Sequence, residues 1–212
     1  MKQQLNVEEV GALLTAVGNA MLEQGAELSE LDGALGDGDM GVTITIAFRT
    51  VKKMIRKEKF GTIEELLSTA AERIAEEAPS TFGTLLSAML NGAGRSCGAS
   101  AGTVEFRDAL TRAAEAVMNR GSAKPGDKTL LDALVPACEA VKKAVREGAA
   151  LPDCAMEAAK AAELGAEETI NMRAVVGRAG YMGDRTIGVK DPGAAAIAMM
   201  LAVTADHMAT DE

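Results

Sequence analysis

The sequence is poor in aromatic residues and in histidine. Aromatic residues make up 2% of the 212 residues, and there is no tryptophan, whereas hydrophobic residues make up 48%. This length suits one domain with a sizeable core, which must be built mainly from Ala, Leu, Val, Ile and Met, a composition that favours closely packed helices. The only histidine is His207, close to the last residue, so Ser-His-Asp and Cys-His catalytic arrangements are not expected.

Cysteines, basic charge and long apolar runs are also scarce. Cys97, Cys138 and Cys154 have no C-x-x-C spacing, which argues against a disulfide framework or zinc site and favours buried free thiols. The formal net charge of −9 argues against binding to nucleic acid or to an anionic membrane surface. The most apolar run, residues 194–203, is too short to span a bilayer. We therefore expect a cytoplasmic protein without nucleic-acid or membrane partners.

Helical periodicity dominates the rest of the chain. We predict eight helices joined by short loops, over residues 7–24, 42–57, 62–77, 83–92, 103–120, 128–147, 152–173 and from Pro192 onward. Thr62 and Glu65 match a capping box, whereas residues 92–102 look like a Gly/Ser linker. VTITIAF, residues 42–48, also fits a short strand, but helix is preferred because no partner strand is evident. The expected fold is all-α, with one domain over residues 1–212 and neighbouring helices antiparallel.

The stretch LDGALGDGDMG, residues 31–41, places Asp32, Asp37 and Asp39 among four glycines. Its G-x-G-x-x-G is not a dinucleotide fingerprint, because no convincing strand precedes it and the aspartates would repel a pyrophosphate. An EF-hand is excluded because the twelfth position counted from Asp37 is Phe48, not Glu. The chain also lacks the G-K-[ST] of a P-loop.

Metal binding explains this aspartate cluster best. Three carboxylates in one turn repel one another unless a cation neutralises them, and oxygen ligands favour Mg²⁺, Mn²⁺ or Ca²⁺. The start of the following helix would add N–H donors for a phosphate. The alternative is an ordinary loop in which Asp39 only caps that helix.

Two more loops have a similar composition. In KPGDKTLLDALVP, residues 124–136, Asp127 is placed to cap a helix. GRAGYMGDRTIGVKDPGA, residues 177–194, is a long Gly-rich loop with Arg178 and Arg185. Such loops in compact domains tend to be functional, and arginines suit phosphate contacts; a solvated surface loop is the alternative.

Together these three motifs, in this order and spacing, resemble the nucleotide-binding (L) subunit of dihydroxyacetone kinase, over roughly residues 30–200. The resemblance implies a barrel of eight antiparallel amphipathic helices with a nucleotide, ADP or ATP, at one end. It implies that Asp32, Asp37 and Asp39 hold two Mg²⁺ ions against the phosphates. It further implies nucleotide-binding roles for Met40, Gly41, Val42, Thr43, Gly121, Leu130, Arg178, Asp191, Pro192 and Gly193.

The resemblance also implies partners and leaves the donor open. In the family a separate K subunit or domain holds the triose covalently on a histidine, and either ATP donates the phosphate or a phosphotransferase M subunit rephosphorylates bound ADP. Met40 stands where the phosphotransferase type usually has His, and a Gly-rich phosphate loop expected at residues 76–80 is replaced by sequence in which Ser80 and Thr81 offer hydroxyls. A homodimer is a further expectation. The alternatives are a non-catalytic nucleotide- or lipid-sensing barrel and a paralogous kinase subunit for another small ketose or polyol.

Overall fold

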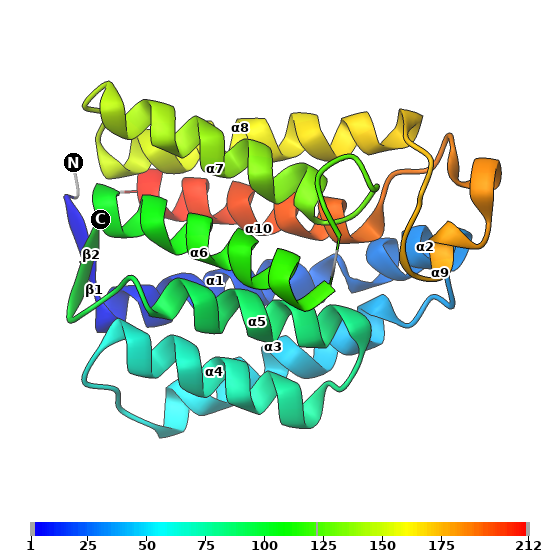
Figure 1. Cartoon of the computed structure of the whole chain (residues 1–212). Helices are drawn as coiled ribbons and strands as arrows, with labels where there is room; N and C mark the ends of the chain where they lie inside the picture. Colours follow the sequence, from blue (N-terminus) through cyan, green and yellow to red (C-terminus); the bar gives the residue numbers. More distant parts are fainter. Residues whose placement is uncertain (1–2, 122, 211–212) are drawn as a thin grey trace.

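The computed structural model describes residues 3–121 and 123–210, and it is mostly helical (Figure 1). Eight helices of 14 to 19 residues form its body: α1 (Val7–Glu23), α3 (Met40–Lys57), α4 (Ile63–Glu77), α5 (Thr81–Gly94), α6 (Thr103–Gly121), α7 (Leu131–Arg146), α8 (Leu151–Glu168) and α10 (Pro192–Ala209). The predicted all-α class is confirmed. None of the helices in the described ranges combines the length and apolar character needed to cross a membrane.

The eight long helices form a closed ring. Each packs against two neighbours, in the order α1, α3, α4, α5, α6, α7, α8, α10 and back to α1. Successive long helices run in opposite directions along the barrel (Figure 1). The predicted barrel of eight antiparallel helices is therefore confirmed. Because the directions alternate, the starts of α3, α5, α7 and α10 all lie at the same end, on the right of Figure 1.

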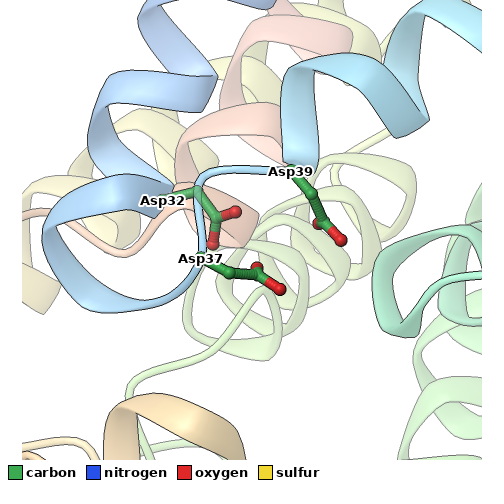
Figure 2. Close-up of side chains that lie close together, drawn as sticks. All are labelled: Asp32, Asp37 and Asp39. Carbon is green, nitrogen blue, oxygen red and sulfur yellow. The ribbon is translucent and has the colours of Figure 1, made fainter.

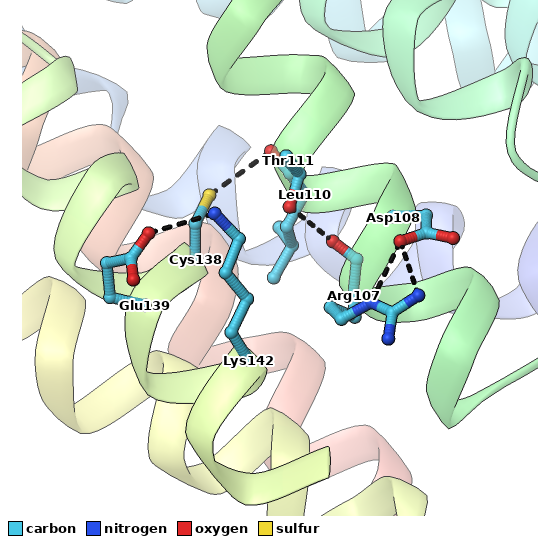
Figure 3. Close-up of polar contacts among 7 residues, drawn as sticks. All are labelled: Arg107, Asp108, Leu110, Thr111, Cys138, Glu139 and Lys142. Atoms are coloured by element: carbon cyan, nitrogen blue, oxygen red, sulfur yellow. Dashed lines mark hydrogen bonds and ion pairs between the residues drawn. The ribbon is translucent and has the colours of Figure 1, made fainter. Parts of the chain in front are cut away.

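The core is built from small and aliphatic side chains, as the composition predicts. Met21, Leu28, Ile44 and Leu131 are fully buried, and the closely packed helices α7 and α8 carry many buried alanines. The three cysteines are buried and free, as expected. The Cys138 thiol of α7 donates to the carbonyl oxygen of Leu110 on α6 (3.2 Å; Figure 3), and burial raises the pKa of Cys138 to about 12.

Helix α3 includes the segment whose β-branched alternation also fitted a strand. Thr43, Ile44, Ala47, Phe48 and Val51 are buried, and this three-to-four-residue spacing is that of one helical face. Burial against neighbouring helices thus outweighs the intrinsic strand preference of Val, Ile and Thr.

The N-cap predicted for α4 is present in modified form. The Thr62 hydroxyl accepts the N–H of Glu65 at 3.0 Å. The Glu65 carboxylate accepts the N–H of Gly61 at 2.7 Å, whereas a standard capping box would use the N–H of Thr62 itself. The reciprocal contact is therefore shifted by one residue.

Helix α2 (Gly25–Leu35) and a two-stranded ribbon were not predicted. Helix α2 occupies part of what the sequence suggested was a loop, so Asp32 lies on a helix. A short antiparallel ribbon pairs β1 (Gln4–Asn6) with β2 (Ser100–Gly102), with Leu5 opposite Ala101. The segment read as a Gly/Ser linker thus ends in a strand, and three-residue strands are too short to leave a periodic signal in the sequence.

Other helix boundaries also differ from prediction. Helix α7 starts at Leu131, because residues 128–130 form a turn, and α8 ends at Glu168 before the 3₁₀ turn η1 (Thr169–Asn171). The loop before α10 contains the one-turn helix α9 (Gly177–Gly180) and the 3₁₀ turn η2 (Gly183–Thr186).

Candidate functional site

The α2–α3, α4–α5, α6–α7 and α8–α10 connections gather at the end of the barrel where α3, α5, α7 and α10 begin (Figure 1). They surround a cavity of about 1040 Å³. Its walls come from the α2–α3 turn, the start of α5, the end of α6, residues 128–130, residues 176–181 and the start of α10. Helix N-termini present unpaired N–H groups and partial positive charge, so this end of an acidic protein is suited to anions.

The three aspartates of the α2–α3 turn converge at the edge of this cavity. Asp32 lies in α2, Asp37 in the connecting turn and Asp39 directly before α3. One carboxylate oxygen from each lies within 4.8 Å of the others, and Figure 2 shows the side chains projecting to the same side of the turn. Asp39 makes no side-chain capping bond to α3. The alternative in which Asp39 serves only as a cap is therefore wrong.

Backbone geometry holds the turn in this shape. Gly38 has a φ of +75°, a backbone conformation that residues other than glycine rarely adopt. A Cβ atom on Gly41 would lie 2.1 Å from the carbonyl oxygen of Gly25, so only glycine lets α3 begin this close to α2. The N–H of Met40 donates to Asp32 Oδ2 at 3.2 Å, and the N–H of Gly41 donates to Ser29 Oγ at 3.1 Å.

The carboxylate geometry fits a hard divalent cation. Mg²⁺ holds oxygen ligands at 2.0–2.1 Å, so ligands on opposite sides of one ion lie about 4 Å apart, and Ca²⁺ allows about 5 Å. The observed separations, within 4.8 Å, lie inside the Ca²⁺ value, and their upper limit is somewhat wider than one Mg²⁺ would hold between opposite ligands. Asp37 and Asp39 are exposed, which leaves room for waters and phosphate oxygens in the remaining positions.

Arg178 provides positive charge beside this cluster. It lies on α9, and its Nη1 forms an ion pair with Asp37 Oδ2. The structure thus brings together two motifs that are far apart in the sequence. Arg185, which also seemed suited to phosphate, instead donates from Nε to the carbonyl oxygen of Met182 (3.4 Å) and is not among the cavity residues.

Most of the residues assigned to nucleotide binding line the cavity: Met40, Ser80, Thr81, Gly121, Leu130, Arg178, Asp191, Pro192 and Gly193. Gly41, Val42 and Thr43 do not. The Val42 side chain is 62% exposed, and the buried Thr43 hydroxyl donates to Ser80 Oγ at 3.0 Å. The Met40 and Gly41 N–H groups, expected to face phosphate, are bonded within the α2–α3 turn.

Ser80 links two of the helix starts. Its hydroxyl oxygen caps α5 by accepting the N–H of Gly83 at 3.0 Å, and it also accepts the Thr43 hydroxyl. A serine hydroxyl has two acceptor positions and one proton to donate, so Ser80 retains its O–H for a ligand. Thr81 lies beside it and is exposed.

Asp191 lines the cavity at the start of α10. Its Oδ2 accepts the N–H of Ala194 at 2.8 Å, which caps α10, and its own N–H donates to Thr169 Oγ1 at 2.9 Å. Burial, together with the charge of Asp132, raises the pKa of Asp191 to about 7 against the lowering effects of the Ala194 bond and the Lys128 ammonium.

Two buried charged residues beside this wall were not predicted as part of the site. The Asp132 carboxylate accepts the N–H groups of Gly126 and Thr129, the latter at 2.7 Å, and thereby orders the turn before α7. Asp127, expected to cap a helix, instead accepts the N–H of Lys124 at 2.9 Å. Lys128 was expected to begin a helix, but its φ is +60° and its side chain is buried. No sequence signal marks a lysine as buried, because lysine is normally exposed.

Comparison with known proteins identifies the family of this chain. The sequence model of the DAK2 domain family matches residues 34–206 of this chain. The chain is 31% identical over 205 residues to the "PEP-dependent dihydroxyacetone kinase, ADP-binding subunit DhaL" of Escherichia coli, covering 91% of this chain and 92% of the relative. It is 35% identical over 199 residues to the L-erythrulose kinase of Pectobacterium atrosepticum, covering 91% of this chain and 33% of the relative.

A solved structure has the same fold. The dihydroxyacetone kinase of C. freundii, in complex with AMP-PNP and Mg²⁺, superimposes with a TM-score of 0.73 at 25% identity, covering 97% of this chain and 35% of that one. The present chain thus spans about a third of the erythrulose kinase and of the C. freundii kinase, but nearly all of the E. coli subunit. The fold and site define a helical barrel with a carboxylate cluster beside a cavity. The chain belongs to the DAK2 domain family.

Proposed function

We propose that this chain is the nucleotide-binding, phosphoryl-transferring subunit of a dihydroxyacetone-type kinase. The observation that carries the proposal is the convergence of Asp32, Asp37 and Asp39, within 4.8 Å, at the edge of a cavity that several helices face with their N-termini. The E. coli relative is named an ADP-binding subunit, and the C. freundii relative was solved with AMP-PNP and Mg²⁺.

The three aspartates would hold two Mg²⁺ ions, which would neutralise negative charge on the polyphosphate of ADP or ATP. Arg178, already next to Asp37, would place a guanidinium against the phosphates. Ser80 would donate its free O–H, and the first N–H groups of α5, at Thr81 and Phe82, would add the positive end of a helix dipole. Asp191, Pro192 and Gly193, which also line the cavity, would bound the nucleotide at the start of α10.

The phosphate acceptor would be held by another polypeptide, a K-type subunit. The chain has a single histidine, His207, at the C-terminal end of α10 and thus away from the cavity. Around the cavity end, Val175, Tyr181 and Ile187 are exposed by 57%, 93% and 51%. Exposed apolar side chains that cluster near a site are typical of a contact surface, and phosphate transfer between subunits requires the partner to dock at this end.

The acceptor would be a small ketose such as a triose or erythrulose, because the relatives include dihydroxyacetone and L-erythrulose kinases and the human triokinase/FMN cyclase. ATP would serve as donor, or bound ADP would be rephosphorylated by an M-type phosphotransferase subunit. Mass spectrometry of the purified protein separates these routes: ADP that resists exchange indicates a coenzyme, whereas free exchange with ATP indicates a donor.

The activity test uses Asp37→Asn in the complex reconstituted with a K-type subunit. Asp184→Asn is the matched control, because Asp184 is exposed at the same end and pairs with Arg173, outside the cavity. We expect Asp37→Asn to abolish phosphorylation of dihydroxyacetone while helical content is retained, and Asp184→Asn to remain active. Full activity of Asp37→Asn would refute the assignment.

A second candidate is a sensor that binds Mg-nucleotide without turnover. It is favoured by the residues at 76–80, EEAPS, where Ser80 is a helix cap and the Gly-rich phosphate loop of the family is missing. Tight Mg-ADP binding without turnover, in the presence of a K-type subunit and with either donor, would support the sensor over the kinase subunit.

A further inference from the structure

Lys128 is buried in the wall of the cavity in an unusual setting. Its side chain is 2% exposed, and it is the only non-glycine residue with positive φ within residues 3–121 and 123–210. Its Nζ donates to four backbone carbonyl oxygens: those of Thr169 (2.7 Å), Met172 (3.1 Å), Thr186 (2.6 Å) and Val189 (2.6 Å). We refer to these four carbonyl groups as the carbonyl cage.

The carbonyl cage joins two stretches of chain to the turn before α7. Thr169 and Met172 follow the end of α8, whereas Thr186 and Val189 lie just before α10. Buried carbonyl groups need a hydrogen-bond donor, and an ammonium group supplies three protons from a single point. The three protons thus serve four carbonyl groups from both ends of the loop at residues 172–190, with at least one proton shared between two oxygens.

The charges around Lys128 match this role. Burial lowers the pKa of Lys128, and the charge of Asp191 opposes this by raising it. Four carbonyl dipoles pointing at one atom favour its charged form. Asp191 is itself bonded to the same region, because its N–H donates to the Thr169 hydroxyl.

Cavity residues lie on the segments that the cage joins. Arg178 lies on the loop at residues 172–190, where it pairs with Asp37, and Asp191 follows that loop directly. Other bonds inside the loop are local by comparison: Ala174 N–H donates to Thr186 Oγ1 at 3.0 Å, and Gly188 N–H donates to the carbonyl oxygen of Ile170 at 2.7 Å. Lys128 therefore connects this loop to the α6–α7 turn through four bonds, and one longer backbone bond, from Val175 N–H to the carbonyl oxygen of Asp127 (3.4 Å), joins the same two segments.

We propose that Lys128 is a positioning residue, whose ammonium group in the carbonyl cage fixes the loop at residues 172–190 so that Arg178 reaches the nucleotide. The effect on nucleotide binding rests on the proposed function, whereas the effect on the loop does not. Lys128 acts through Arg178, so its contribution to nucleotide affinity exists only when Arg178 is present.

The first test measures the loop itself in nucleotide-free protein by amide hydrogen exchange. In Lys128→Met the amides of residues 172–190 exchange faster by about tenfold or more, while those of α1 and α4 remain as protected as in the wild type. Lys190→Met is the control, because Lys190 lies in the same loop but pairs with Glu167 outside the cage, and it leaves exchange within about twofold. Unchanged protection in Lys128→Met would overturn the proposal whether or not nucleotide binds.

The second test is a double-mutant cycle on Mg-ADP affinity, measured by calorimetry. Lys128→Met and Arg178→Met each weaken binding by about tenfold or more, but the double variant binds no more weakly than Arg178→Met, because the two residues act as one unit. Additive losses, as from a general weakening of the fold, would overturn the proposal. In Lys128→Ala, added propylammonium refills the carbonyl cage and restores loop protection, whereas the uncharged propanol does not; equal effects of the two would also overturn it.

Discussion

The buried carboxyl group of Asp191 gives the protein a pH-dependent stability that one substitution should remove. Asp191 is N-cap of α10, and burial raises its pKa from 3.8 to about 7. Since the folded state holds the proton more tightly than the unfolded chain, the contribution of Asp191 to stability is largest below pH 4 and is lost as the pH rises through 7. Asp191→Asn keeps an oxygen acceptor for the cap but cannot titrate.

The size of the effect follows from the two pKa values. The pKa is 3.8 in the unfolded chain and about 7 in the folded protein. Between pH 5 and pH 8 the free energy of unfolding of the wild type should therefore fall by about 2–3 kcal/mol relative to that of Asp191→Asn. Urea unfolding of both proteins at several pH values measures this difference, because other titrating groups cancel between them. Asp191→Ala should be less stable than Asp191→Asn by ~1 kcal/mol at every pH, since alanine cannot cap α10.

The result that would refute this reasoning is a stability difference between the wild type and Asp191→Asn that stays constant, or that grows in favour of the wild type, as the pH rises. Either outcome would mean that the Asp191 carboxyl group is ionised in the folded protein at pH 5. The burial of its side chain would then not control its protonation.

Three further predictions concern the turn, the packing of α3 and the thiols. In urea unfolding with EDTA, Asp39→Ala should leave the free energy of unfolding unchanged or raised, because the Asp39 side chain does not cap α3. Thr62→Ala should lower it by ~1 kcal/mol, because the Thr62 side chain caps α4. Equal losses in the two variants would contradict this. Gly41→Ala should cost about 1–3 kcal/mol, since its Cβ would clash with the carbonyl of Gly25, whereas Gly98→Ala, with nothing within 4 Å, should not show this loss. Cys138 should resist thiol reagents at pH 8 until the protein unfolds, because burial raises its pKa to about 12; rapid labelling of the native protein would contradict this.

The long helices could be predicted from the sequence because each buries a continuous apolar face that recurs every three to four residues. Helix α2 could not: its only buried residues are Gly25, Leu28 and Leu35, and its glycines read as a loop. The ribbon of β1 and β2 brings residues 4–6 against 100–102, a pairing between distant segments that no local pattern specifies.

The aspartate cluster was predictable because three like charges in one short segment call for a neutralising ion. The placement of Arg178 at the same site was expected from the family resemblance, because spacing along the chain does not reveal which loops meet. The burial of Lys128 and Asp132 was not predictable, because both residue types are usually exposed. Their partners are backbone groups, whose positions depend on the completed fold.

The central claim is that the carboxylates of the α2–α3 turn bind divalent cations that in turn bind a polyphosphate. Calorimetric titration of ADP into the wild type, Asp37→Asn and Asp184→Asn, each with Mg²⁺ and with EDTA, tests it most directly. The account predicts Mg²⁺-dependent binding by the wild type and by Asp184→Asn, and affinity lower by about tenfold or more in Asp37→Asn. Equal ADP affinity in EDTA, or an Asp37→Asn variant that binds Mg-ADP as tightly as the wild type, would contradict it.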